Sequence, residues 1–217
     1  MNKKNWLDGI TGIVFDFNGT LVFDAHLHVL SWSEISLMLT GKEMSEEENR
    51  QLSGKNNAVI IQMMRPELTP EQNKEYSLKK EAVYRKMVVE QNLPLVPGTI
   101  DLFDYLKQNN IPFTISSASI KENIDFFVEY FHLSNWMNPE NIRYDDGTYA
   151  DKIQMFKDAA AAIGSPVEST LIFEDSPTGI RCAHEAGFKH IIQIKKDKNS
   201  PSIDHTKMSI LDFTELQ

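Results

Sequence analysis

The sequence of 217 residues has only one cysteine, Cys182, so it cannot build an internal disulfide framework. No window approaches the 18 uncharged apolar residues that a membrane-spanning helix requires. No sustained apolar stretch follows the basic residues near the N-terminus, which argues against a secretory signal. We therefore expect a cytoplasmic protein that has no membrane partner.

Basic residues are also scarce relative to acidic ones. Lysine and arginine total 22 against 31 aspartate and glutamate, for a formal net charge of -9. This balance disfavours nucleic acid as a main partner, because such affinity depends on clustered positive charge. The sequence also lacks a G-x-S-x-G elbow and a Walker-type loop, which disfavours an acyl-transfer hydrolase and a nucleotide triphosphatase. Small anionic ligands stay compatible with the composition if a local pocket or a metal offsets the charge.

The apolar segments that are present are short and regularly spaced. Runs typical of buried strands occupy residues 10–17, 111–117, 169–173 and 189–194. Helix-compatible sequence separates them, including a stretch at helical spacing that ends at Gly164 and a helix start at Ser176-Pro177. This alternation predicts an α/β fold with a Rossmann-like parallel sheet.

Residues 22–94 have a different pattern, in which helical segments follow one another without a convincing strand. Thr69 and Gln72 form a predicted capping box at the start of a long helix that runs toward Gln91. We expect two domains, an α/β core of residues 1–21 and 95–217 and an inserted helical domain of residues 22–94.

Polar side chains follow three of the predicted strands. Asp16 closes the first, Ser116 and Ser117 end the second, and Glu174 and Asp175 follow the third. The carboxyl ends of parallel strands meet at one edge of a sheet, where such folds bind ligands. A carboxylate can attack phosphorus only if the negative charge of the substrate is neutralised, and carboxylate oxygens suit magnesium better than zinc.

Three motifs, DFNGT from Asp16, FTISSAS, and LIFEDSPTG, resemble those of the haloacid dehalogenase-like phosphatases, in particular the β-phosphoglucomutase-like branch with a helical type-one cap. The resemblance extends over nearly the whole chain. It implies Asp16 as nucleophile, Thr20 as a helper in the turn, and a cap that closes over the substrate. The implied phosphate-binding residues are Ser117, Ala118 and Lys152, and the implied Mg²⁺ ligands are Asp16, Asn18, Glu174 and Asp175.

Two of these assignments leave an alternative. Ser117 is preferred to Ser116 because of its spacing to the following helix, and its alternative role is an ordinary cap or surface serine. Lys152 is the best candidate for the lysine of the family's third motif, although counting back from Gly164 points to Ala150 instead.

Asn18 departs from the family pattern, which usually has a second aspartate at this position. Its backbone carbonyl can still bind metal, but its side chain cannot transfer a proton, and positioned acid/base catalysis is typically worth about 100- to 10,000-fold. We therefore expect a slow phosphatase, one suited to good leaving groups, or one that recruits another base.

Residues of the insert supply further candidates. His28 can exchange protons near neutral pH and is a catalytic candidate, with hydrogen bonding in a hinge as the alternative. Asp24 and His26 are weaker candidates in the same segment. Lys55 and Asn56 belong to a segment, Gly54-Lys55-Asn56-Asn57, that resembles a substrate-contacting loop of the family, with a helix-start turn as the alternative.

The sequence thus predicts a magnesium-dependent phosphatase for a small phosphorylated metabolite, acting through an aspartyl-phosphate. Asn18 also supports a second hypothesis, a binding or regulatory protein that has lost turnover. A phosphomutase is a third possibility that the missing proton chemistry disfavours.

Overall fold

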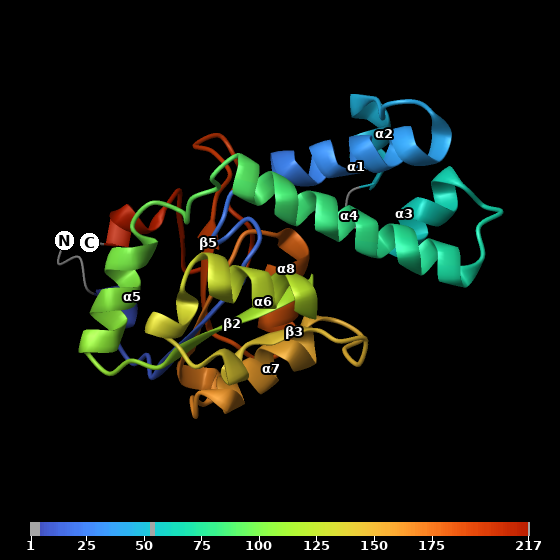
Figure 1. Ribbon diagram of the computed structural model, residues 1–217. Helices are drawn as coiled ribbons and strands as arrows, with labels where there is room; N and C mark the ends of the chain where they lie inside the picture. The colour runs from blue at the N-terminus through green and yellow to red at the C-terminus, as the bar shows by residue number, and fades with distance from the viewer. Residues whose placement is uncertain (1–4, 53–54, 217) are drawn as a thin grey trace. The chain divides into compact units, whose positions relative to one another are not determined.

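The structure is a computed structural model that describes residues 5–52 and 55–216. Gly54 of the proposed loop lies outside the described residues. The described chain divides into two compact units (Figure 1). One unit contains the residues up to Phe23 and those from Pro94 onward, and the other contains Asp24–Leu93.

The first unit is built on a six-stranded parallel sheet with strand order β3-β2-β1-β4-β5-β6. The strands are β1 (Gly12–Phe15), β2 (Phe113–Ile120), β3 (Arg143–Asp145), β4 (Thr170–Glu174), β5 (His190–Ile194) and β6 (Met208–Ile210). The predicted α/β fold class is confirmed, and the four predicted strands correspond to β1, β2, β4 and β5. The sequence did not predict β3 and β6, which have three residues each and lie at the two edges of the sheet.

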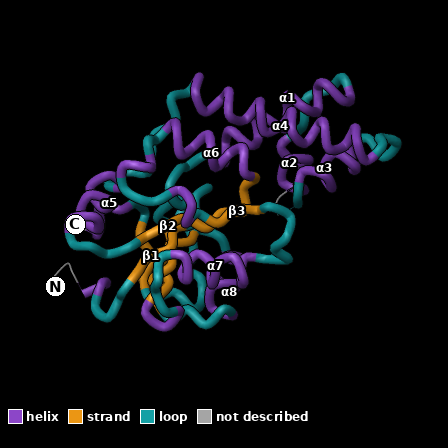
Figure 2. The backbone as a smooth tube through the Cα atoms, turned by 60° about the horizontal axis from the view of Figure 1, so that its bottom comes forward, coloured by secondary structure: helices purple, strands orange, loops and turns teal. Residues whose placement is uncertain are grey.

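Helices cover both faces of this sheet (Figure 2). They are α5 (Thr99–Gln108), α6 (Lys121–Tyr130), α7 (Lys152–Ala162) and α8 (Pro177–Glu185). Short 3₁₀ turns lie at Asn5–Leu7, Leu133–Asn135, Pro139–Asn141, Val167–Ser169 and Phe213–Leu216. As predicted, Ser176 caps α8: its hydroxyl accepts a hydrogen bond from the backbone N–H of Gly179 at 3.0 Å.

The core of this unit explains why β1 lies at its centre. Val14 packs with Phe156 and Ile172 on the face that α7 and α8 cover. The next side chain, Phe15, points to the other face and stacks on Phe173 at 4.9 Å between ring centroids. Because β1 is buried on both faces, its residues form a continuous apolar run. Asp16, the first polar residue after this run, lies at the carboxyl end of the strand.

The described residues of the second unit form helices and no strand. The helices are α1 (Ala25–Thr40), α2 (Glu46–Leu52), α3 (Asn57–Met64) and α4 (Pro70–Glu90), and α1 lies along α4. The predicted capping box is confirmed, because Thr69 and Gln72 exchange both side-chain-to-backbone hydrogen bonds at the start of α4. Trp32, Ile35, Ile60 and Ile61 form its apolar core.

Within the described part of the chain, none of the helices combines the length and apolar character needed to span a bilayer.

Candidate active site

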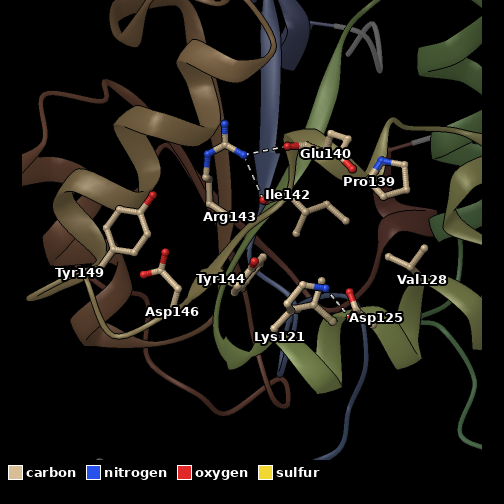
Figure 3. Close-up of a pocket in the computed structure, with 11 residues that line it drawn as sticks. Lys121, Asp125, Val128, Pro139, Glu140, Ile142, Arg143, Tyr144, Asp146 and Tyr149 are labelled. Carbon is tan, nitrogen blue, oxygen red and sulfur yellow. Dashed lines mark hydrogen bonds and ion pairs between the residues drawn. The ribbon is translucent and has the colours of Figure 1, made fainter.

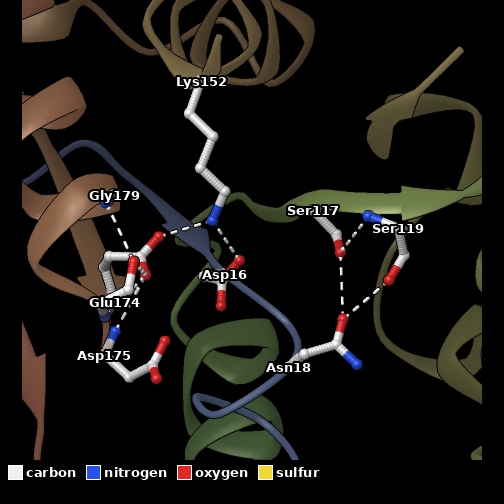
Figure 4. A network of polar contacts seen from close by, with 9 residues as sticks. Asp16, Asn18, Ser117, Ser119, Lys152, Glu174, Asp175 and Gly179 are labelled. Atoms are coloured by element: carbon white, nitrogen blue, oxygen red, sulfur yellow. Dashed lines mark hydrogen bonds and ion pairs between the residues drawn. The ribbon is translucent and has the colours of Figure 1, made fainter. Parts of the chain in front are cut away.

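The ends of β1, β2 and β4 and the start of α7 bring together six predicted site residues: Asp16, Asn18, Ser117, Lys152, Glu174 and Asp175 (Figure 4). Asp16 lies between the other two strands, and its backbone N–H donates to the carbonyl of Phe173 at 2.9 Å. Its side chain is 6% exposed, so most of its solvation has been removed. A buried carboxylate in this position needs a compensating positive charge.

Lys152 supplies part of that charge. Its Nζ lies 2.5 Å from Asp16 Oδ1 and 2.7 Å from Glu174 Oε2. Lys152 is the first residue of α7, and the Asp151 carboxylate fixes this turn by accepting from the backbone N–H of Ile153 at 2.8 Å. Burial lowers the pKa of Lys152, but the two carboxylates outweigh burial and raise it above the ordinary value. The ammonium group therefore stays charged.

Glu174 uses both carboxylate oxygens within the protein. Its Oε2 accepts from Lys152, and its Oε1 accepts from the backbone N–H groups of Asp175 and Ser176 and from the Ser176 hydroxyl, at 2.9–3.1 Å. Burial opposes its ionisation, yet Lys152 and these donors hold its pKa below the ordinary value. Gly179 packs against this carboxylate so closely that a Cβ there would lie 2.1 Å from Oε2. Glu174 thus anchors Lys152 and the turn into α8.

Asp175 lies against the turn that contains Gly19. A Cβ built on Gly19 would lie 2.3 Å from Asp175 Oδ2, and Gly19 has a positive φ of 83°, so only glycine fits here. Burial and the nearby charges of Asp16 and Glu174 raise the pKa of Asp175 to about 9. Burial and Glu174 also raise the pKa of Asp16 to about 7, despite the opposing effect of Lys152.

These residues satisfy the chemical requirements for a divalent cation. Asp16, Glu174 and Asp175 each have an oxygen within 4.8 Å of the others. Three carboxylates against the one ammonium of Lys152 leave two excess negative charges, the charge that one Mg²⁺ would balance. The raised pKa values of Asp16 and Asp175 express the same imbalance. The oxygen-only donor set fits a hard cation, with Asp16 and Asp175 as the carboxylates whose charge is least compensated.

Hydroxyl groups form the other side of the site. The Asn18 side-chain oxygen accepts from the Ser119 hydroxyl at 2.8 Å and from the Ser117 hydroxyl at 3.4 Å. The backbone N–H of Ser119 donates to Ser117 Oγ at 3.2 Å. Between the two serines lies the exposed residue Ala118. Ser116 is fully buried and its hydroxyl makes no hydrogen bond within the described residues, whereas Ser117 faces Asn18.

Ser119 is a site residue that our sequence analysis missed. Residues i and i+2 of a strand point to the same side, which was the one signal available. Thr20, by contrast, was predicted as a helper in the turn. Its hydroxyl is buried and makes no hydrogen bond within the described residues, although its backbone N–H donates to Phe17 at 3.2 Å.

His28 belongs to a network inside the helical unit. Its Nε2 lies 3.2 Å from Asp24 Oδ2, its Nδ1 lies 2.8 Å from Lys80 Nζ, and its ring stacks on Tyr84. Lys80 also contacts Glu81 at 2.9 Å. Both ring nitrogens of His28 are therefore engaged within this unit. The hydrogen-bonding role that was the alternative for His28 is present in the structure.

The other candidates of the helical unit have simpler surroundings. Asn56 caps α3, because its side-chain oxygen accepts from the backbone N–H of Val59 at 2.9 Å, and Lys55 before it is exposed. This arrangement is the helix-start turn that was the alternative to a substrate loop. His26 is exposed and contacts Gln91 at 3.2 Å.

A pocket of about 380 Å³ lies beside α6 and β3 (Figure 3). Tyr144 in its lining pairs in register with Ser117 of β2. Its two basic side chains already have partners within the protein: Lys121 contacts Asp125 at 2.5 Å, and Arg143 donates to the carbonyls of Glu140 and Ile142. The pocket lacks the clustered carboxylates of the site described above.

The fold is Rossmann-like, and an aspartate lies at the carboxyl end of its central strand β1, as in a class of hydrolases. The sequence profile of the haloacid dehalogenase-like hydrolases matches residues 13–193. The chain belongs to this family, which confirms the family, the fold and the enzyme class of hydrolase that were expected from the sequence.

Similar proteins include one solved structure and one curated relative at moderate identity. A family IA, variant 3 hydrolase from Entamoeba histolytica is 32% identical and has a TM-score of 0.86, with 95% of each chain covered. A probable pseudouridine-5'-phosphatase from Drosophila melanogaster is 27% identical over 191 residues, which cover 84% of this chain and 81% of that protein. A β-phosphoglucomutase from Clostridium difficile shares the fold, with 19% identity, a TM-score of 0.76, and coverage of 96% and 93%.

Proposed function

We propose that this protein is a magnesium-dependent phosphatase for a small phosphorylated metabolite. The observation that carries the proposal is the position of Asp16, which contacts the Lys152 ammonium and belongs to a cluster of three carboxylates with two excess negative charges. The curated relative from Drosophila melanogaster supports a phosphate monoester as substrate. The single cysteine supports a cytoplasmic location.

Asp16 is the nucleophile in this proposal. One of its oxygens forms a bond to phosphorus while the bond from phosphorus to the leaving oxygen breaks, which gives an aspartyl-phosphate. Water then attacks this phosphorus, releases orthophosphate and restores the carboxylate. Lys152 and the Ser117 hydroxyl donate hydrogen bonds to phosphoryl oxygens, and the Ala118 backbone lies next to Ser117. Asp16, Asp175 and the Asn18 carbonyl would hold Mg²⁺, which would neutralise the excess charge and that of the phosphoryl group.

We assign Glu174 to the support of Lys152, because both of its oxygens are already in use. The helical unit, residues 24–93, serves as the cap that excludes water and selects the metabolite. Its candidates for substrate contact are Lys55 and Asn56, and its candidate for proton exchange is His28.

Asn18 determines which substrates react quickly. The departing oxygen of a sugar phosphate needs a proton, and the Asn18 amide cannot supply one. An acyl or aryl phosphate has a better leaving group and needs this proton less. We therefore expect acetyl phosphate and p-nitrophenyl phosphate to react faster than pseudouridine 5'-phosphate or a sugar phosphate.

The test is phosphate release from these four kinds of substrate, with Mg²⁺ and with a chelator. We expect release that depends on Mg²⁺. The Asn18→Asp variant should gain about 100- to 10,000-fold on the poor leaving groups and less on acetyl phosphate, since positioned acid/base catalysis has this magnitude. Asn199→Asp, the same change at an exposed site, should leave all rates unaltered. Equal rates for wild type and Asn18→Asp on every substrate would contradict the proton argument.

The second candidate function is that of a regulatory protein that binds a phosphorylated metabolite without turnover. Asn18 is the observation that favours it. Saturable binding of a substrate, without release of phosphate from any member of the panel, would support this function over catalysis.

A further inference from the structure

We propose that the pocket beside α6 and β3 is a second ligand site, which takes a small organic molecule with one oxyanion group and an apolar or aromatic body. Arg143 binds the oxyanion, a carboxylate or a phosphate-like group. The residues that line the pocket do not include Asp16, Asn18, Ser117, Lys152, Glu174 or Asp175. The site is therefore separate from the catalytic cluster, and the inference does not depend on the proposed function.

The pocket has the size and the lining of a small-molecule site. Its volume of about 380 Å³ falls within the range of about 300–1,000 Å³ that is typical of such sites. Ile124 and Val128 of α6 and Ile142, directly before β3, supply apolar surface. Tyr144 and Tyr149 add two half-buried aromatic rings (Figure 3). These side chains can cover the apolar body of a ligand.

Arg143 uses one of its three nitrogen atoms for contacts with the described part of the chain. Its Nη1 donates to the carbonyl of Glu140 at 2.9 Å and to that of Ile142 at 3.1 Å. Its Nε and Nη2 donate to no described residue. Together they form an edge with two parallel N–H donors, which matches two oxygens of one carboxylate or phosphate. Because the two carbonyls hold Nη1, this edge is already oriented for a ligand.

The charge of Arg143 is also uncompensated. The side chain is half-buried, so it has lost part of its hydration. Among the residues that the structure describes, no carboxylate forms an ion pair with it. Two neutral carbonyls compensate a guanidinium less well than an anion does, because hydrogen bonds between charged partners are stronger. An oxyanion in the pocket would supply the missing negative charge.

The other charged groups of the lining do not take this role. Lys121 and Asp125 neutralise each other at 2.5 Å. Asp146 accepts from the backbone N–H of Thr148 at 2.9 Å and from its hydroxyl, so it stabilises its own turn. Asp146 and Glu140 are exposed, where water and salt screen their charge. They should weaken the binding of an anion without preventing it.

Tyr149 offers a ring that is held in place beside Arg143. Its hydroxyl donates to Asp158 Oδ2 at 3.0 Å, and the Gln154 amide donates to the other oxygen of this carboxylate at 2.7 Å. Burial and Asp158 raise the pKa of Tyr149, and the charge of Arg143 opposes them, which shows that the guanidinium lies near the ring. A molecule bound to Arg143 can therefore lay a flat body against Tyr149 (Figure 3).

The first experiment titrates the wild-type protein with four probes by ligand-observed NMR, in a chelator and without Mg²⁺. Under these conditions the excess negative charge of the catalytic cluster repels anions. Phenylacetate and phenylphosphonate carry the two kinds of oxyanion on an aromatic body, and the tighter of them identifies the preferred group. Acetate, which lacks the body, and 2-phenylethylamine, which has the opposite charge, should bind more weakly.

The second experiment repeats the titration on variants whose folding is checked by thermal unfolding. Arg143→Gln should weaken the binding of phenylacetate about 10- to 150-fold, the value of hydrogen bonds to a charged group. Arg143→Lys keeps the charge without the two-donor edge and should lose less. Asp146→Asn removes a like charge and should strengthen binding by up to about 5-fold. Arg181→Gln, at an exposed arginine outside the pocket, is the matched control and should leave the affinity unchanged.

Several results would overturn the inference. They are equal affinity in wild type and Arg143→Gln, 2-phenylethylamine binding as tightly as phenylacetate, and no binding of either oxyanion by wild type. The comparison of probes on wild type decides alone if Arg143→Gln does not fold. Asp16→Asn should bind phenylacetate as wild type does, and an altered affinity would place the anion at the catalytic cluster and refute the second site. A protein that binds phenylacetate through Arg143 but releases no phosphate would contradict the proposed function alone.

Discussion

Lys152 in the α/β unit and Lys80 in the helical unit are both shielded from solvent, with 15% and 3% of their side chains exposed. Burial alone lowers the pKa of each. For Lys152, two carboxylates at 2.5 and 2.7 Å reverse this effect and raise the pKa. For Lys80, burial prevails over Glu81 at 2.9 Å and over Asp24, and the pKa is lowered. The balance between desolvation and nearby carboxylates thus decides how firmly a buried lysine holds its charge.

The largest effect should come from removing Asp16, the carboxylate that Lys152 contacts in addition to Glu174. Asp16→Asn removes the proposed nucleophile and leaves Lys152 with Glu174 alone, as Lys80 is left mainly with Glu81. We expect phosphate release to fall on the order of 10⁴-fold or more, because the covalent step is lost. Asp204→Asn, at an exposed site, is the control and should keep full activity. Retention of a tenth of the wild-type rate in Asp16→Asn would argue against Asp16 as nucleophile.

The next largest effect should come from Lys152→Gln, which leaves three clustered carboxylates without a cation. Breaking a buried ion pair by removing one partner typically costs about 3–5 kcal/mol, so we expect a loss of this size in the free energy of unfolding without Mg²⁺. Urea unfolding measures it, and Mg²⁺ should recover part of the loss. A variant as stable as wild type in a chelator would contradict the charge balance that we describe.

Lys80→Gln should destabilise the protein less. The wild-type lysine already bears a desolvation cost that its partners do not fully offset, and Glu81 keeps the hydrogen bond from the Asn57 amide at 2.6 Å. We expect a loss of about 1–3 kcal/mol from the unmet buried groups.

The neighbouring lysine provides a matched control for this variant. Lys79 is half exposed and pairs with Glu75, so Lys79→Gln should leave the free energy of unfolding nearly unchanged. The double variant Lys80→Gln/Glu81→Gln should lose less stability than the two single variants summed. Strict additivity would show that the two side chains are not coupled.

The last prediction concerns Asp175 and the dependence of stability on pH. The pKa of Asp175 is 3.8 in its ordinary state and about 9 in the folded protein. Between these values the folded state keeps a proton that the unfolded state has released, so without Mg²⁺ this group makes the protein less stable as the pH rises. Asp175→Asn removes the penalty, and its advantage over wild type should grow from about pH 4 to about pH 9.

In thermal unfolding near pH 8 with a chelator, we expect Asp175→Asn to melt at least about 2–4 °C above wild type, since about 1 kcal/mol already produces this shift in a chain of this size. Mg²⁺ should stabilise wild type but not this variant. Parallel melting curves for the two proteins across the pH range would refute the assignment of Asp175 as an undercompensated carboxylate.

Much of the α/β unit could be predicted because its signals are local. Buried strands such as β1 give continuous apolar runs, Asp16 and Asp175 follow directly on their strands, and Glu174 is the last residue of β4. The Thr69–Gln72 capping box is a contact over three residues, which a short sequence pattern can encode. By contrast, β3 and β6 are too short for a periodic pattern to stand out from a loop.

The features that escaped sequence analysis depend on residues far apart in the chain. Ser119 meets Asn18 across 101 positions, and Lys80 meets His28 across 52. Strand and helix periodicity fix the direction of each side chain within its own element but do not pair one element with another. The contacts of Glu174 were equally hidden, because its two oxygens accept hydrogen bonds from Lys152 and from the following turn.

The shift in register where β2 passes β3 makes the length of this segment as important as its composition. If Ala118 were deleted, Ile120 would stand two positions after Ser117 and would replace the Ser119 hydroxyl with an aliphatic side chain on the same side of the strand. This deletion would leave Ser117 and all other residues of the three family motifs unchanged in identity. Natural variants of this chain should therefore tolerate substitutions at position 118 far better than insertions or deletions there.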